Sequence, residues 1–510
     1  MNNSKDYYNS TSYEETIYSI TESLWSSVDK MRGHLPTSDY KFYFLTVFFY
    51  KYICDYSIDY ENFIKEKDSH YNKENDARFI IPDNTEFDKL KYNSKRVDFG
   101  KEINRTFRKI EEANTPKLAG VLTYLDFTNP RIFGDQQHRE NFLTSLIESF
   151  ANITFQPSKV SNSIIAECFE LLYEKFAQID GKSSEEFQTP PEIGKLIGKL
   201  LKPESNETIY DPACGSGSLL LALHQEVSSK TTGAEIYGQE LNIGVHAIAK
   251  MRMIIHELDS SNIAWGDSLN NPQYFDDKDP DSLKQFDVVI SNPPFSVENW
   301  WKSGKEYNRF KWGMPPRNKG DYAFIQHMLV SAKEDTGRIG IVVNNGVLFR
   351  GGTESNIRQQ IIEDNLLDAV IGLPGNLLSY TGIPIALLLF SKARTINNNI
   401  LFIDASKEFT QDKRRNTLSS EGIERIVSAY KTYKKNPTKE SAAIQRGFCN
   451  ICTKEEVIEN DHNLNINRYI EYEEEAPINL NSLKSEVEEL DKKISMVRNE
   501  IRQNLDKLGL

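Results

Sequence analysis

The sequence predicts an α/β protein: a wound, mostly parallel sheet, with a helical region before it and one amphipathic helix after it. Between residues 181 and 393, short β-rich runs alternate with helical stretches, which is typical of parallel strands joined by crossover helices. Residues 13–180 instead carry apolar side chains at spacings of three and four, as amphipathic helices do. We therefore expect four regions: a helical domain (1–180), a sheet domain (181–410), a C-terminal extension (411–477) and a C-terminal helix (478–510).

Individual elements follow from apolar spacing. The first helix is expected to bury the face formed by Ile17, Ile20, Leu24, Trp25, Val28 and Met31. Two more helices are expected at 40–54 and 164–179, whereas the polar segment 68–100 predicts loops and short elements. The expected strands are 207–210, 235–239, 263–265, 286–291, 338–343, 366–371, 385–390 and 400–404. The rest of the C-terminal extension follows no pattern that predicts a fold.

Composition excludes several classes of protein. Of the 510 residues, 39% are hydrophobic and 26% are charged, as in a globular protein rather than a disordered or membrane-spanning one. The N-terminal segment 1–13 is polar and has no apolar signal segment, so we expect a cytoplasmic protein with no membrane partner. The only close cysteine pair, Cys449 and Cys452, lacks the further ligands that a zinc site needs, so we expect no metal.

The charge balance bears on nucleic-acid binding. The chain has 61 Lys and Arg residues against 74 Asp and Glu residues, a net charge of −13. A protein that gripped DNA alone over a long footprint would be basic. The short basic runs 317–319 and 413–415 are as compatible with an ordinary solvated surface as with phosphate contacts. Any nucleic-acid contact is therefore expected to be local or shared with a partner subunit.

The first chemical motif is the loop Asp211-Pro212-Ala213-Cys214-Gly215-Ser216-Gly217-Ser218, between an expected strand and an expected helix. Its glycines allow a sharp turn and close approach to a ligand, and the helix that follows offers unpaired N–H groups. Two acidic residues support a ligand site: Glu240 ends the second strand, about where doubly wound folds place a ribose-binding carboxylate, and Asp267 follows the third. The set suits a nucleoside with two hydroxyls and an amino group.

The second motif, Asn292-Pro293-Pro294-Phe295, directly follows the fourth expected strand. Because proline has no N–H, this loop presents acceptors: the Asn292 side-chain oxygen and the Pro293 carbonyl. Two such acceptors can hold an exocyclic amine and favour a more tetrahedral nitrogen, which frees its lone pair for attack on an electrophilic methyl group. Phe295 can stack on a base that has been rotated out of a duplex.

Together these motifs resemble those of the DNA adenine N6-methyltransferase (modification) subunits of type I restriction-modification systems. The resemblance extends to 24–33, 50–55, 321–324, 344–348, 372–374 and 463–469. It implies a Rossmann-like S-adenosylmethionine-dependent catalytic domain, with Asn292, Pro293, Pro294 and Phe295 at the target adenine. By the same resemblance, Asp211, Pro212, Ala213, Gly215, Ser216, Gly217 and Ser218 surround the methionine part of the cofactor, Glu240 its ribose and Asp267 its adenine. The segment Glu186, Phe187, Gln188, Thr189 and Pro190 would close over it, although Gln188 stands where an aromatic residue is usual.

The resemblance also implies partners. In such systems a separate specificity subunit reads double-stranded DNA, two modification subunits join it, and restriction subunits complete the cleaving complex. The C-terminal helix suits a coiled-coil-type contact with the specificity subunit, since Leu483, Val487, Leu490, Ile494, Val497, Ile501, Leu505 and Leu508 form one apolar seam. Packing of this helix on its own chain is the equally weighted alternative.

Three other functions stay open at this point. The chain could be a self-sufficient DNA adenine methyltransferase, an RNA or protein N-methyltransferase, or a binding protein that retains an inactive methyltransferase fold. The first is disfavoured because few residues follow the sheet domain, and the last because both motifs are intact. A cytosine C5-methyltransferase is excluded, because no cysteine nucleophile follows the fourth strand.

Overall fold

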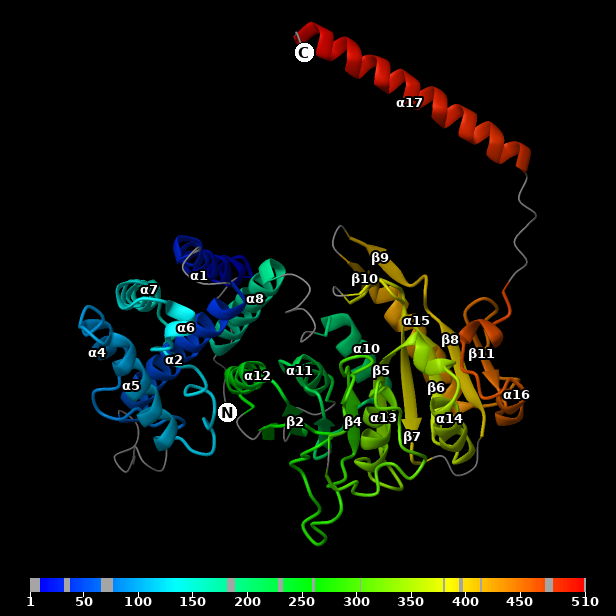
Figure 1. Ribbon diagram of the computed structural model, residues 1–510, viewed down its shortest axis with the longest axis horizontal. Helices are drawn as coiled ribbons and strands as arrows, with labels where there is room; N and C mark the ends of the chain where they lie inside the picture. Colours follow the sequence, from blue (N-terminus) through cyan, green and yellow to red (C-terminus); the bar gives the residue numbers. More distant parts are fainter. Residues whose placement is uncertain are drawn as a thin grey trace.

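The computed structural model describes residues 10–31, 37–65, 77–180, 189–227, 233–258, 262–302, 304–378, 381–393, 398–412, 415–472 and 480–508. Within these residues, a nine-stranded sheet has the order β11-β8-β6-β7-β5-β4-β1-β2-β3 (Figure 1). Its strands are β1 (Thr208–Asp211), β2 (Glu235–Glu240), β3 (Asn262–Trp265), β4 (Val288–Ser291), β5 (Arg338–Asn344), β6 (Leu367–Gly372), β7 (Ile385–Ser391), β8 (Ile400–Asp404) and β11 (Cys449–Cys452).

Strand direction follows the expected winding. Strands β3, β2, β1, β4 and β5 run parallel to one another, whereas β7 runs antiparallel to both β5 and β6. The chain builds outward from β1 to β3, then returns to place β4 on the other side of β1. Strands β4, β6 and β7 are buried along their whole length, which explains their continuous apolar sequences.

Helices cover both faces of the sheet. One face packs against α10 (Pro191–Leu201), α11 (Ser218–Gln225) and α15 (Ser420–Lys435), and the other against α13 (Asp321–Val330) and α14 (Thr353–Glu363). Alternate residues of a strand point to opposite faces, so Ile209 joins the first core and Tyr210 the second. The fold is therefore a three-layer sandwich with a separate core on each side of the sheet.

A helical region precedes the sheet. It consists of α1 (Ser10–Met31), α2 (Thr37–Lys65), α4 (Phe87–Tyr92), α5 (Phe99–Ala113), α6 (Pro130–Phe133), α7 (Gln136–Ser149) and α8 (Asn162–Asp180). Aromatic rings dominate its core. Phe44, for example, lies 5.6 Å from Phe176 and 4.9 Å from Phe150 between ring centroids. Apolar rings at helical spacing thus pack against one another here rather than forming a ligand site.

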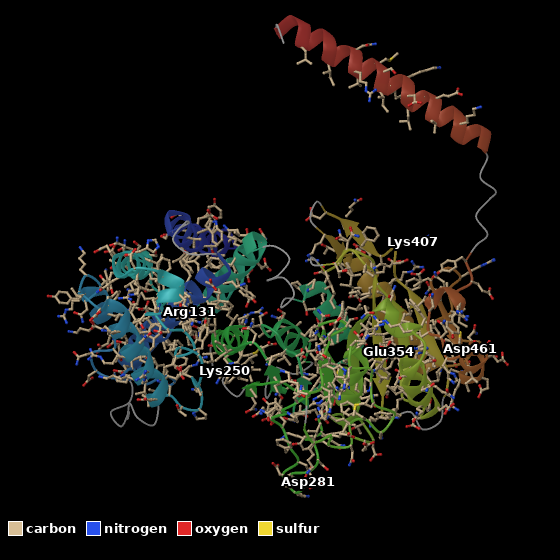
Figure 2. The ribbon with its side chains drawn as sticks, viewed as in Figure 1. Arg131, Lys250, Asp281, Glu354, Lys407 and Asp461 are labelled. Carbon is tan, nitrogen blue, oxygen red and sulfur yellow. The ribbon has the colours of Figure 1, made fainter. Side chains whose placement is uncertain are left out.

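Helix α12 (Ile243–Ile255) joins the helical region to the sheet. Its residues Ile248 and Met251 belong to the core of the helical region, whereas Ala249 and Met253 belong to the core under the sheet. Lys250 of the same helix donates to the Ala119 carbonyl at 3.0 Å and lies at the boundary of the two regions in Figure 2. Because one helix serves both cores, the two regions are mechanically connected.

The C-terminal extension contributes to the same sheet. It contains β10 (Asn416–Leu418), α15, β11, α16 (Lys454–Glu459) and η2 (Ile466–Arg468). Strand β10 pairs with β9 (Phe409–Gln411), at the start of the extension, in a separate two-stranded sheet. Strand β11 pairs antiparallel with β8 at the sheet edge and carries Cys449 and Cys452, both buried free thiols. Among the described residues, no cluster of three or more His, Cys, Asp or Glu side chains is arranged to hold a metal ion.

The final helix, α17 (Leu480–Leu508), stands apart from the sheet in Figure 1. The predicted α/β fold, with a mostly parallel sheet and an N-terminal helical region, is confirmed. The coiled-coil contact of α17 stays a prediction: its residues Val487, Leu490, Ile494, Val497 and Ile501 are exposed by 48–53%. In the described part of the chain, no helix combines the length and the apolar character needed to span a bilayer.

Candidate active site

The order of the strands reverses between β1 and β4, and a cavity of about 1030 Å³ lies at their carboxyl ends. Ligands of wound α/β folds bind at such reversal points, because the loops diverge there and leave a crevice. The cavity is large enough for a nucleoside cofactor together with a second planar group. Both sequence motifs reach it, one from β1 and one from β4.

The glycine loop closes the β1 side of the cavity. Asp211 is 1% exposed, and its Oδ1 atom accepts from the Ala213 N–H at 2.9 Å and from the Ser291 hydroxyl at 2.8 Å. The carboxylate thus connects the loop after β1 to the end of β4. Gly217 has a φ of +82°, and a Cβ there would lie 2.4 Å from the Met253 side chain, so this turn requires glycine.

Arg252 of α12 supports the glycine loop from outside the cavity. Its guanidinium donates to the Ser216 carbonyl at 2.6 Å, the Ser216 hydroxyl at 2.8 Å and the Ser218 hydroxyl at 3.0 Å. The same group forms a bidentate pair with Glu170 of α8, at 2.6 and 2.9 Å. The two serines therefore face Arg252 rather than the cavity, and the helical region contacts the glycine loop through one buried ion pair.

Two further carboxylates line the cavity. Glu240 accepts from the N–H groups of Gly215 at 3.0 Å and Asn242 at 2.7 Å, which leaves lone pairs for the hydroxyls of a ribose. Asp267 accepts from the N–H groups of Leu269 and Asn270 at 3.0 and 3.1 Å. Buried Arg309 donates to two backbone carbonyls just after Asp267, that of Ser268 at 3.0 Å and that of Leu269 at 2.8 Å. Both carboxylates are thus fixed by backbone contacts.

Burial changes the acidity of this site. Removal from water, aided by the nearby charge of Glu240, raises the pKa of Asp211 to about 7. Burial also raises the pKa of Glu240 above its ordinary value. Two carboxylates whose ionisation is disfavoured gain from a positive charge placed between them. The carboxylates of Asp211 and Glu240 therefore fit a cationic ligand such as S-adenosylmethionine, which carries a sulfonium and an ammonium group.

The motif after β4 forms the opposite wall. The Asn292 Nδ2 group donates to the Thr189 hydroxyl at 3.1 Å, which orients the side-chain amide. The Asn292 Oδ1 atom is buried, yet it has no hydrogen-bond partner among the described residues. A buried acceptor without a partner costs about 1–3 kcal/mol, so such an atom in a cavity marks a ligand contact. Phe295 lines the same cavity.

The structure brings most of the predicted site residues together. The cavity is lined by Thr189, Asp211, Pro212, Ala213, Gly215, Glu240, Asp267, Asn292, Pro294 and Phe295. Pro190, Ser216, Gly217, Ser218 and Pro293 are not among its lining residues. Glu186, Phe187 and Gln188 lie outside the described residues.

Sequence reasoning assigned no role in the site to a second group of lining residues. They include Leu241, Asn242, Trp300, Phe324, Asn344, Asn345, Gly346, Arg350, Thr381 and Ile383, of which Phe324 and residues 344–346 lie in segments that the family resemblance covers. Asn344 ends β5, and Asn345 and Gly346 follow it, so the rule that ligands bind at the carboxyl ends of strands could have placed them in the site. Arg350 and Trp300 belong to longer loops and carry no comparable signal.

The sheet order, the reversal-point cavity, the glycine loop and the strand-terminal carboxylates define the class of protein. They are the features of a wound α/β protein that binds a nucleoside or nucleotide ligand at the carboxyl ends of its strands.

Comparisons with known proteins identify the family. The N-6 DNA methylase family matches residues 160–477, more than half of the chain, and the HsdM N-terminal domain matches 20–150. The chain belongs to the N-6 DNA methylase family, whose members are in general S-adenosylmethionine-dependent methyltransferases.

Individual relatives agree with this assignment. The chain is 28% identical to the type I restriction enzyme MpnII methylase subunit of Mycoplasma pneumoniae, over 95% of each chain. It is 33% identical to the MjaVIII methylase subunit of Methanocaldococcus jannaschii, over 75% of this chain and 66% of that one. A type I restriction-modification methyltransferase subunit from Streptococcus thermophilus has a similar structure, with a TM-score of 0.76, 27% identity and coverage of 90% and 100% of the two chains.

Proposed function

We propose that this chain is the modification subunit of a type I restriction-modification system, which transfers a methyl group from S-adenosylmethionine to N6 of an adenine in DNA. The observation that carries the proposal is the Asn292 Oδ1 atom, a buried acceptor without a partner in a cavity that also holds the glycine loop. An adenine amine is the kind of donor that this acceptor lacks. The alignment of this chain with a type I restriction enzyme methylase subunit over 95% of both chains supports the choice of substrate.

In this proposal each wall of the cavity has its own role. Glu240 accepts hydrogen bonds from the ribose of the cofactor, Asp267 contacts its adenine, and the loop of Asp211 surrounds its methionine part. The cofactor supplies an electrophilic methyl group. Thr189 holds the Asn292 amide so that Oδ1 accepts from the target amine, which makes its nitrogen more tetrahedral and more nucleophilic. Phe295 stacks on the base, which is rotated out of the duplex to reach the cavity.

The carbonyl of Pro293 is the second acceptor that we assign to the target amine. Pro293 is buried and is flanked by Asn292 and Pro294, which both line the cavity. Proline at both positions removes N–H donors that would compete with the amine for these acceptors. This assignment also explains why the reaction needs no basic side chain at this point of the loop.

Partners follow from the same proposal. The active complex contains double-stranded DNA, a specificity subunit with two modification subunits, and restriction subunits when it cleaves. The exposed seam of α17 is the surface that we assign to the specificity subunit. A structure titled as complex assembly and conformational transition of the type I system covers 96% of this chain, with a TM-score of 0.65 at 18% identity, and so supports the fold alone. We assign the regions 1–180, 181–410, 411–477 and 478–510 to the helical domain, the catalytic domain, an extension and the subunit contact.

The test is a methyl-transfer assay with labelled S-adenosylmethionine and unmodified DNA, with the chain alone and together with a specificity subunit encoded beside it. The expected result is N6-methyladenine in the mixture only. Methylation by the chain alone would instead indicate a self-sufficient enzyme. Transfer to RNA or protein but not to DNA would contradict the proposed substrate, and cofactor binding without any transfer would indicate an inactive fold.

A further inference from the structure

Five polar side chains form a cluster beside the Asn292 loop; we call it the Asp321 cluster. Its members are Ser296, Asp321, Asn344, Arg350 and Glu354, which come from the Asn292 loop, the start of α13, the end of β5, the segment after η1 (Asn345–Leu348) and α14. Asp321 and Glu354 are only 4% and 2% exposed. Glu354 is labelled on α14 in Figure 2. Charged groups are costly to remove from water, so buried charges such as these are retained mainly where they have a structural or functional role.

The cluster meets the Asn292 loop at one strained residue. Ser296, which directly follows Phe295, has a φ of +52°, a region that non-glycine residues adopt at a cost of about 1–3 kcal/mol. Its N–H donates to Asp321 Oδ1 at 3.0 Å. The turn that ends the Asn-Pro-Pro-Phe segment is thus held in an unfavourable conformation by a carboxylate from a different element.

Asp321 is itself fixed by two donors. The Asn344 Nδ2 group donates to Asp321 Oδ1 at 2.9 Å, and the Arg350 guanidinium donates to Asp321 Oδ2 at 2.8 Å. Arg350 also donates to the Asn344 side-chain oxygen at 2.7 Å and to the Ser296 hydroxyl at 3.2 Å. These bonds close a ring of contacts around the turn, so the position of each member depends on the others.

Gly346 makes room for this arrangement. A Cβ at Gly346 would lie 2.5 Å from Arg350 Nε and 2.8 Å from Arg350 Cζ. Any side chain at this position would therefore displace the guanidinium. Glu354 completes the environment, since it accepts from Arg350 at 3.3 Å and its side chain is 3% exposed. The cation is held between two carboxylates at the cavity wall.

We infer that Asp321 and Arg350 are positioning residues for methyl transfer: they hold the turn at Ser296 and thereby set where Phe295 and Asn292 meet the target base. This inference rests on the proposed function of the cavity. The cluster lies on the β4–β5 side, away from the glycine loop. Its loss should therefore reduce the rate of the chemical step and leave cofactor binding intact. Misplacement of a reacting group by about 1 Å can reduce a rate by about a hundredfold.

The test compares D321N with D368N in the full-length chain, assayed with its specificity subunit. Asp368 is the matched control, because it is also buried and accepts from Tyr430 at 2.6 Å and Lys434 at 3.2 Å, yet does not line the cavity. We expect D321N to lower kcat about tenfold to a hundredfold, with the Kd for S-adenosylmethionine within about twofold of wild type. D368N should lose stability by a similar amount but keep kcat.

Two more variants separate positioning from folding. Gly346→Ala should displace the Arg350 guanidinium and lower kcat without removing any charge. R350K restores the charge but not the forked geometry, so it should recover only part of the activity that R350M loses. In a double-mutant cycle, D321N and R350M should be strongly non-additive in kcat, whereas D368N and R350M should be additive.

The outcomes distinguish this inference from the proposed function. If the wild-type complex transferred no methyl group to DNA, this result would contradict the proposed function, on which the role of the Asp321 cluster depends. A wild-type complex that is active, together with D321N and Gly346→Ala enzymes that keep wild-type kcat, would overturn the role of the cluster alone. Equal losses of kcat in D321N and D368N would mean that the Asp321 cluster only stabilises the fold, which would overturn its positioning role. A 2-aminopurine probe at the target position, measured by its fluorescence, would show whether the base still leaves the duplex.

Discussion

The two loops that face each other across the cavity differ in how their polar groups are satisfied. In the glycine loop, Asp211 accepts from Ala213 and Ser291, and the two serines accept from Arg252. In the loop after β4, the Asn292 amide has one contact, to Thr189, and its oxygen has no partner among the described residues. The glycine loop is held by contacts within the described part of the chain, whereas the loop after β4 keeps one acceptor open.

The difference between the two loops indicates separate roles in binding and in the chemical step. A loop that is already satisfied by its own chain is preorganised and loses little freedom when the cofactor binds. An open acceptor instead costs free energy until a donor arrives, and proteins tolerate such costs mainly at functional sites. Substitutions on the cofactor side should therefore change affinity and stability, and those on the target side should change turnover.

The largest effect is expected for Asn292→Ala, which removes the open acceptor. Turnover in single-turnover methyl-transfer assays should fall about a hundredfold or more, because the amine loses the contact that makes it nucleophilic. The Kd for S-adenosylmethionine, measured by calorimetry, should stay within about twofold of wild type. Unchanged turnover in this variant would refute the role assigned to Asn292 and erase the contrast between the two loops.

The next largest effect concerns the support of the glycine loop. Arg252→Met removes the donor to Ser216 and Ser218 and leaves Glu170 without its bidentate partner. We expect the free energy of unfolding in urea to fall by about 3 kcal/mol and cofactor affinity to fall about tenfold. His256 lies 3.2 Å from Glu170 and cannot replace the fork.

Arg338→Met is the matched control for Arg252→Met. Arg338 also forms a bidentate pair with Glu207, at 2.6 and 3.1 Å. It is the first residue of β5, at the amino end of the strand, whereas the cavity lies at the carboxyl ends. This variant should lose stability and keep its affinity for the cofactor. Equal losses of affinity in both variants would show that the affinity reports general stability rather than the position of the glycine loop.

A smaller effect is expected from pH. Because the pKa of Asp211 is raised to about 7, its carboxyl is largely protonated at pH 6 and ionised at pH 8. A cationic cofactor prefers the ionised form, so its affinity should be about tenfold higher at pH 8 than at pH 6. Asp211→Asn should flatten this dependence. Calorimetry at both pH values would measure it, and a flat wild-type profile would contradict the link to Asp211.

The sign of the effect on folding is opposite. A carboxyl whose pKa is higher in the folded than in the unfolded chain binds more protons when folded, so its contribution to stability decreases as the pH rises from about 4 to about 7. The stability of Asp211→Asn relative to wild type should therefore be greater at pH 8 than at pH 5. Glu170 behaves in the other direction, since its partner Arg252 outweighs burial and lowers its pKa to about 2.

The smallest effect on the cavity is expected from α17. Ile494→Lys places a charge in the exposed seam, where side chains make few contacts with the rest of the chain. The melting temperature should stay unchanged, with a free-energy difference within about 0.5 kcal/mol, while association with the specificity subunit should be lost in a pull-down assay. Lys492→Ala, on another face of the helix, is the control. A large loss of stability in Ile494→Lys would indicate that the seam packs on its own chain.

Sequence reasoning reached the strand-end residues of the site and missed the residues that support them. Glu240 ends β2 and Asn292 directly follows β4, so their place at the carboxyl ends of the strands follows from the predicted strand positions. Ser216 and Ser218 were expected at the cofactor, but they turn toward Arg252, because spacing does not set the direction of a side chain in a loop. Arg252 carries no local signal, since its partners Glu170, Ser216 and Ser218 lie far away along the chain, and the contact of Arg350 with Asp321 joins residues 29 positions apart.

Local features of the chain were enough to predict the alternating strands and helices, the glycine loop, the acidic residues at the ends of the second and third strands and the Asn-Pro-Pro-Phe loop. These depend on local periodicity and on the backbone preferences of glycine and proline, which act between near neighbours. The packed structure was needed to show that β11 extends the sheet, that Arg252 connects the helical region to the glycine loop, and that Asp321 holds the strained turn at Ser296. Those contacts join distant residues, and their geometry exists only once the layers have packed.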